Sequence, residues 1–169
     1  MSTKGTSGLS AAHRIRARDL AVQAALLSLR HAPAIHYSQG PNRFDGIAHN
    51  LKAWRGQYPR EVDCSSSVAW WLWNGLDHYG VRDVVNGAGW RAGYTGTMVG
   101  HGIRVQHVAN VLRGDAVIYG DPFGRTGHTA LVVGERNGVP MVVSHGSERG
   151  PFYLPFNYRS DVHSIRRYI

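Results

Sequence analysis

The most informative segment of this chain is DCSSSVAWWLWNGLDHYG, residues 63–80. Asp63 suits a helix N-cap because its carboxylate accepts hydrogen bonds from the free N–H groups of a first helical turn. Gly80 supplies a stop signal at the other end. Four residues between them share one helical face and predict a buried helix: Cys64, Val68, Trp71 and Gly75. The pattern therefore places Cys64 in the first turn of a buried helix.

A cysteine at that position suits acyl-transfer chemistry. The N-terminus of a helix carries partial positive charge and free N–H groups, which favour a thiolate and can hold an oxyanion. Cys64 is the single cysteine of the chain, so an intrachain disulfide or a cysteine-rich zinc site is excluded. A lone cysteine is also commonly a small buried apolar residue, and this interpretation stays open from the helix alone.

The second half of the chain predicts an antiparallel sheet. Segments 115–119, 129–133 and 139–144 are short and rich in β-branched residues, turn signals separate them, and 162–169 alternates as a final strand. Helices followed by such strands indicate an α+β fold.

A helix is also expected over residues 10–30, capped by Ser10. Its apolar face is expected to contain Ile15, Val22, Leu26 and Leu29. The expected organisation is an N-terminal arm and amphipathic helix over 1–34, followed by a catalytic domain over 35–169.

Two histidines lie at the ends of the predicted hairpin. His128 opens one strand and His145 closes the next, while Asn137-Gly138 marks the turn. Since both lie at similar distances from the turn, they are expected to be cross-strand neighbours. One imidazole can then act as a base while the other holds its tautomer. Two alternatives remain: both are structural strand-end histidines, or they bind zinc together with Cys64.

With these motifs in order, the sequence resembles the NlpC-type cell-wall peptidases, which are papain-like cysteine hydrolases. The resemblance covers roughly residues 35–150, and four segments carry it: DCSSSV (63–68), LRGDAVIY (112–119), GHTALVVG (127–134) and VVSHGS (142–147). One position departs from the family pattern, because Ser66 stands where the family usually has glycine.

The resemblance implies a papain-like α+β fold and a catalytic triad. Cys64 would be the nucleophile, His128 the general base and then acid, and His145 the orienting residue. Asp63 and Ser65 would receive the amine end of the substrate, and Tyr37 would correspond to a substrate-binding tyrosine of the family. The implied reaction is cleavage of peptidoglycan stem peptides between D-glutamate and a diamino acid, without a metal or organic cofactor.

Composition limits the other classes of function. The 169-residue chain is 43% hydrophobic and 18% charged, which fits one folded domain rather than a disordered chain. No apolar run approaches the ~20 residues of a membrane span. The formal net charge of +8 favours polyanionic partners, here the anionic cell wall. No nucleic-acid motif accompanies this charge, so nucleic acid is not an expected partner.

The N-terminal ten residues lack the apolar core of a secretory signal. We therefore expect a monomer that acts at the bacterial cell wall, such as a phage-type lysin released from the host cytoplasm by a separate pore, or a component of a phage particle. Three alternatives stay open: an amidase of the related CHAP type that cuts before L-alanine, an inactive wall-binding module, and a nucleic-acid binder.

Overall fold

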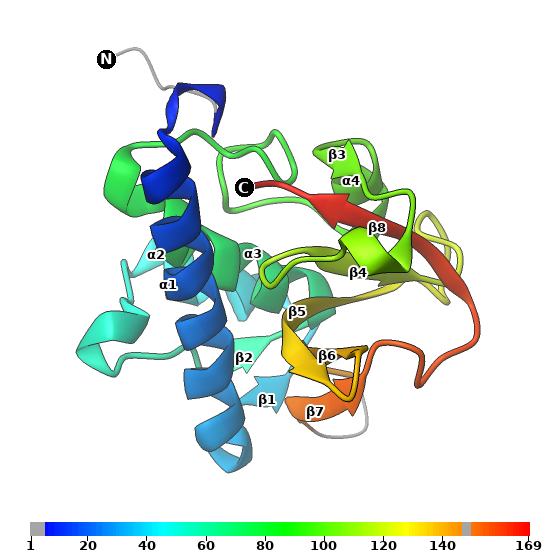
Figure 1. Cartoon of the computed structure of the whole chain (residues 1–169). Helices are drawn as coiled ribbons and strands as arrows, with labels where there is room; N and C mark the ends of the chain where they lie inside the picture. The colour runs from blue at the N-terminus through cyan, green and yellow to red at the C-terminus, as the bar shows by residue number, and fades with distance from the viewer. Residues whose placement is uncertain (1–5, 147–149) are drawn as a thin grey trace.

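A computed structural model describes residues 6–146 and 150–169. Its main helices are α1 (Ala11–Arg30) and α3 (Cys64–Leu76), with the shorter α2 (Asp45–Ala48) and α4 (Thr95–Val99). The helices α1 and α3 lie side by side against one face of a sheet (Figure 1). The chain thus has the expected α+β arrangement, with helices first and the sheet after them.

Six antiparallel strands form that sheet in the order β3-β8-β4-β5-β6-β7. Their bounds are β3 (Ile103–Arg104), β4 (Ala116–Tyr119), β5 (His128–Arg136), β6 (Val139–Ser144), β7 (Phe152–Pro155) and β8 (Val162–Arg167). Four of these strands lie where the sequence predicts strands, whereas β3 and β7 were not predicted. A separate parallel pair joins β1 (His36–Tyr37) to β2 (Glu61–Val62).

The turn between β5 and β6 forms where Asn137-Gly138 predicts it. Asn137 has φ of 51° and Gly138 has φ of 76°. Two consecutive residues with positive φ match the twist of a tight hairpin, and Asn and Gly tolerate that conformation best. A register shift between Val132 and Gly134 interrupts the same hairpin, and it affects the site described below.

The helix α1 begins as predicted, and its buried face includes the expected Val22, with Leu26 and Leu29 packed partly buried against the core. Ser10 caps it by accepting a hydrogen bond from the N–H of His13. Ile15, expected in the core, is 62% exposed. Four alanines that were not predicted contribute to this face: Ala17, Ala21, Ala24 and Ala25. Small side chains let α1 and α3 approach closely. Residues on the contact face of α1 are therefore small rather than bulky.

Close packing ties α1 to the core of the molecule. A Cβ atom at Gly75 of α3 would lie 2.2 Å from the backbone oxygen of Ala17, so only glycine fits there. The indole N–H of Trp71 also donates a hydrogen bond of 2.9 Å to Ser28 of α1. The helix assigned to the arm thus packs directly against the helix that carries Cys64.

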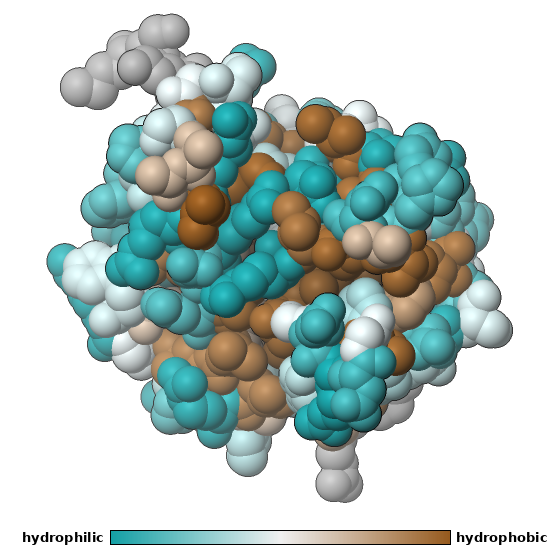
Figure 2. Space-filling view, viewed as in Figure 1, coloured by the Kyte–Doolittle hydropathy of each residue, from teal (hydrophilic) through white to brown (hydrophobic). Residues whose placement is uncertain are grey.

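The outer surface of this layered structure is mixed in polarity. Hydrophilic side chains occupy much of the face seen in Figure 2, and apolar patches interrupt them. Among the described residues, no helix is long and apolar enough to cross a membrane.

Candidate active site

Cys64 is the first residue of α3, as the sequence predicts. Asp63 caps the helix, with its carboxylate accepting from the N–H of Ser66 at 2.7 Å. The hydroxyl of Ser66 in turn accepts from the N–H of Asp63 at 2.9 Å. This reciprocal capping box gives a physical reason for serine at the position where the family pattern has glycine.

The thiol of Cys64 is protonated at neutral pH in this structure. Burial, with a further contribution from the negative charge of Asp63, raises its pKa to about 11. Hydrogen bonds from the backbone N–H groups of Thr129, Ser65 and Cys64 itself act in the opposite direction but are outweighed. The helix N-terminus alone therefore does not produce the thiolate that the sequence suggested, and a base must remove the proton.

Tyr37 lies beside the thiol although 27 positions separate the two residues in the sequence. The parallel pairing of β1 with β2 sets Tyr37 opposite Val62, two residues before Cys64. The Tyr37 hydroxyl hydrogen-bonds to the sulfur, and burial together with Cys64 raises the pKa of Tyr37 to about 12. Tyr37 therefore keeps its O–H proton at neutral pH beside the sulfur.

His128 stands at the start of β5, next to the residue that contacts the thiol. The N–H of Thr129 bonds to the Cys64 sulfur, so the sulfur lies against the second residue of this strand. The Nε2 atom of His128 lies 2.7 Å from the hydroxyl oxygen of Ser144. That oxygen lies 3.0 Å from the hydroxyl of Tyr158. Ser144 and Tyr158 thus fix one nitrogen of the His128 ring.

His145 does not occupy the orienting position expected for it. Near this end of the hairpin the paired residues are Ala130 and Ser144. Side chains alternate between the faces of a sheet, so Ser144 shares the face of His128 and His145 points to the other face. The sequence prediction counted residues from the turn to find which side chains lie opposite each other. The register shift after Val132 offsets the pairing beyond it by one residue, so that count fails. Ser144 consequently hydrogen-bonds to His128, while His145 lies on the opposite face.

The His145 ring is instead buried between α3 and Tyr37. Its Nδ1 atom lies 3.4 Å from the hydroxyl of Ser67, and its ring meets that of Tyr37 edge to face at 5.6 Å. The Nε2 atom is buried and has no hydrogen-bond partner among the described residues. Burial lowers the pKa of His145 to about 4, so the ring is neutral at pH 7.

Asp63 and Ser65, expected to receive an amine, are already engaged by a cation of the same chain. The Nη1 atom of Arg43 donates to the Asp63 carboxylate at 2.6 Å and to the Ser65 hydroxyl at 3.2 Å. Nη2 of Arg43 donates to the carbonyl of Gly93 at 2.9 Å. Arg43 lies in a 3-10 turn, Pro41–Phe44, that the sequence did not mark as functional.

A cavity of about 450 Å³ opens beside His128, Ser144 and Tyr37. We call it the site cavity. Arg125 and Arg159 contribute positive charge to its wall. Arg159 is paired with Asp161, whereas Arg125 makes no ion pair within the described parts of the chain. The site cavity therefore favours a substrate that carries carboxylate groups.

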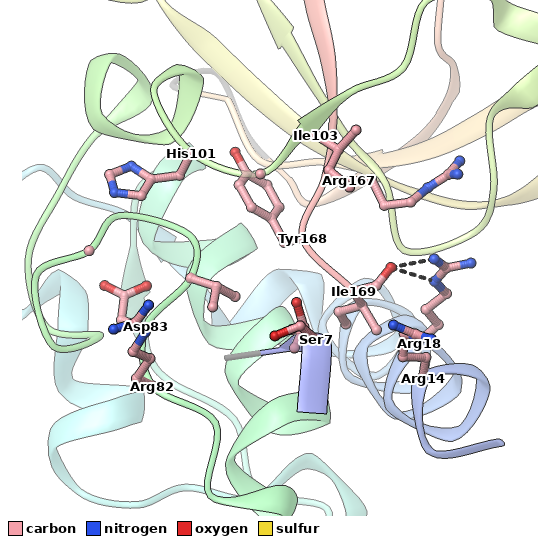
Figure 3. Close-up of a pocket in the computed structure, with 14 residues that line it drawn as sticks. Ser7, Arg14, Arg18, Arg82, Asp83, His101, Ile103, Arg167, Tyr168 and Ile169 are labelled. Carbon is pink, nitrogen blue, oxygen red and sulfur yellow. Dashed lines mark hydrogen bonds between the residues drawn. The ribbon is translucent and has the colours of Figure 1, made fainter. Parts of the chain in front are cut away.

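A second cavity, of about 820 Å³, lies elsewhere and contains none of the predicted site residues. Arg14 and Arg18 of α1, together with Arg82 and Arg167, line this basic cavity (Figure 3). Arg18 donates to the backbone oxygen of Ile169 inside it, and Arg167 pairs with the buried Asp115 outside it.

The zinc interpretation of the three predicted residues finds no support in their arrangement. Across 6–146 and 150–169, no group of three His, Cys, Asp or Glu side chains is placed to hold a metal ion.

Comparison with known proteins identifies the fold. No protein-family model and no curated protein matches the sequence. The structure is similar to NlpC2 from Trichomonas vaginalis, with a TM-score of 0.57 and 20% identity, over 99% of this chain and 50% of that one. It is also similar to NlpC1 from the same organism, with a TM-score of 0.53 and 21% identity, over 88% and 44%.

These similarities define an α+β, papain-like fold of the NlpC type. At such identity they establish the fold alone, and the chain spans about half the length of the proteins it matches. The functional residues must therefore be argued from the geometry of this chain.

Three contributors to the site were missed by sequence reasoning: Ser144, Tyr158 and Arg43. None of the three carried a usable signal, because residues an odd number of positions apart share a face in a regular hairpin with a two-residue turn, and only the register shift brings Ser144 to the face of His128. Tyr158 and Arg43 reach the site through loops whose paths no local pattern encodes.

Proposed function

We propose that this protein is a cysteine hydrolase that cleaves amide bonds in peptidoglycan stem peptides, between D-glutamate and a diamino acid. One observation carries the proposal: the Cys64 sulfur lies at a helix N-terminus against Thr129, the residue that follows His128 in β5. The similarity to NlpC structures supports it through the fold.

The first step forms an acyl-enzyme. His128 removes the thiol proton, and the sulfur attacks the carbonyl carbon of the scissile amide. The N–H of Cys64 and the O–H of Tyr37, which lie beside the sulfur, would stabilise the developing oxyanion. As the carbon–nitrogen bond breaks, His128 returns its proton to the leaving amine.

The second step releases the product. His128 takes a proton from water, the resulting hydroxide attacks the thioester carbon, and the sulfur leaves with a proton regained from His128. The reaction uses groups of this chain and water. Ser144 takes the orienting role first assigned to His145 in the Cys-His-His triad, while His145 supports the ring of Tyr37.

Charge supports an anionic cell wall as the substrate. The net charge of +8 attracts the protein to polyanions, and the arginines of the site cavity suit the free carboxylates of stem peptides. We place the action at the bacterial cell wall, by a monomer and in the manner of a phage-type lysin.

Digestion of purified peptidoglycan of known chemotype, followed by mass spectrometry of the fragments, tests this function. We expect cleavage after D-glutamate, and no cleavage by a folded Cys64→Ala variant. Release of an intact stem peptide would instead identify an amidase of the CHAP type. Wall binding without turnover by the parent protein would identify a binding module, and either outcome contradicts the proposal.

A further inference from the structure

Arg43 forms an ion pair with the carboxylate of Asp63, the residue that precedes the nucleophile Cys64. Each oxygen of the Asp63 carboxylate has partners within the protein. Oδ1 accepts from the Ser66 N–H at 2.7 Å and the Ser65 hydroxyl at 3.0 Å, and Oδ2 accepts from Arg43 at 2.6 Å. The charge of Asp63 is therefore already compensated in the free protein.

The position of Arg43 is held by more than this ion pair. Its guanidinium also bonds to Ser65 and to the carbonyl of Gly93, and it lies over the ring of Phe44 at 4.5 Å. Three segments of the chain thus converge on one side chain, which restricts its rotamers and makes displacement costly. Asp63 is almost fully buried, so loss of its cation would leave a charge poorly solvated.

Arg43 nevertheless remains partly accessible beside the thiol. Its side chain is 22% exposed. The contacts to Asp63, Ser65 and Gly93 use three of the five N–H groups of a guanidinium, which leaves two donors and no acceptor. A positively charged amine gains no acceptor there and is repelled, whereas a neutral amide or an anionic oxygen can accept a hydrogen bond.

We propose that Arg43 is a specificity-determining residue that excludes substrates with a free amine next to Asp63 and selects stem peptides whose alanine nitrogen is acylated. This inference rests on the proposed function and names its substrate class. Acylated alanine is the form present while the stem peptide is attached to the glycan strand. The protein would therefore act on the intact wall rather than on peptides already released from it.

Two synthetic stem peptides that differ only in a free or an acetylated N-terminal amine test the proposal. We expect the parent protein to cleave the acetylated peptide with a kcat/KM about tenfold higher. Arg43→Ala should reverse this preference, because the uncovered Asp63 then attracts an ammonium group. Arg43→Lys keeps a cation and should keep the preference. Arg55→Ala, which removes an arginine stacked on Trp54, is the matched control and should leave the ratio unchanged.

Binding to inactive protein separates this inference from the proposed function. Isothermal titration calorimetry measures the affinity of each peptide without turnover. The proteins titrated are Cys64→Ala and the double variants that combine it with Arg43→Lys or with Arg43→Ala. Tighter binding of the acetylated peptide to Cys64→Ala, reversed by Arg43→Ala, supports the inference. The inference is overturned if Cys64→Ala binds the two peptides with equal affinity, binds the free-amine peptide more tightly, or binds neither peptide. Failure of the parent protein to cleave either peptide contradicts the proposed function. Should Arg43→Ala not fold, retention of the preference in Arg43→Lys supports the inference, and its loss contradicts it.

Discussion

The Cys64 side of the proposed site is held by residues that are neighbours in sequence, whereas the His128 side depends on pairing between strands. Asp63, Cys64 and Ser66 form their capping contacts within four positions. The His128 ring is held by Ser144 and Tyr158, which are 16 and 30 positions away in the sequence. The comparison shows that a local motif can set the place of a nucleophile, but the partner of the base depends on strand register.

The largest expected effect tests whether the two sides act as one unit. His128→Ala should lower kcat by about 10²–10⁴-fold, since it removes the general base and acid. Because the Cys64 thiol has a pKa of about 11, little thiolate forms without a base at neutral pH. Steady-state kinetics on purified peptidoglycan measures the loss, with circular dichroism to confirm folding. Activity equal to that of the parent would remove His128 from the mechanism.

An intermediate effect separates the two possible orienting residues. Ser144→Ala should lower kcat about tenfold with little change in KM, because it removes the hydrogen bond to Nε2 of His128. Tyr158→Phe should cost less, since it leaves the hydrogen bond between Ser144 and His128 in place.

His145→Gln is the matched comparison on the opposite face of the same strand. It should lower kcat less than Ser144→Ala. A larger loss in His145→Gln than in Ser144→Ala would restore the Cys-His-His arrangement that the sequence suggested. All three variants are compared at the same pH and with the same substrate preparation.

The smallest effect concerns stability rather than catalysis. The folded-state pKa of His145 is about 4, below the usual histidine value of about 6.5, because the neutral ring is buried. Between these values the unfolded chain binds a proton that the folded chain does not, so stability falls as pH decreases from 6.5 towards 4. This group should account for a loss of about 2–3 kcal/mol over that range.

Urea unfolding at several pH values measures this contribution. His145→Gln should show a shallower loss of the free energy of unfolding between pH 6.5 and 4 than the parent protein. The exposed His107→Gln is the control and should follow the parent. Parallel curves for His145→Gln and the parent would show that the His145 ring is not held neutral by burial.

Much of the fold was accessible from local patterns. The start of α3, the Ser10 cap of α1 and the Asn137-Gly138 turn all depend on chemistry within a few residues. Errors arose where packing over longer distances decides. Ile15 was wrongly placed in the core because Gly75 brings α1 and α3 so close that alanines make up much of their contact.

The same distinction holds within the site. Sequence alone determined that Cys64 begins a helix beside Asp63 and that His128 opens a strand, because capping and turn preferences act through adjacent backbone groups. That Ser144 faces His128 depends on the assembled sheet, since one register shift reverses which side chains share a face. That Arg43 covers Asp63 also depends on the tertiary structure, because the charges that meet depend on the path of the whole chain.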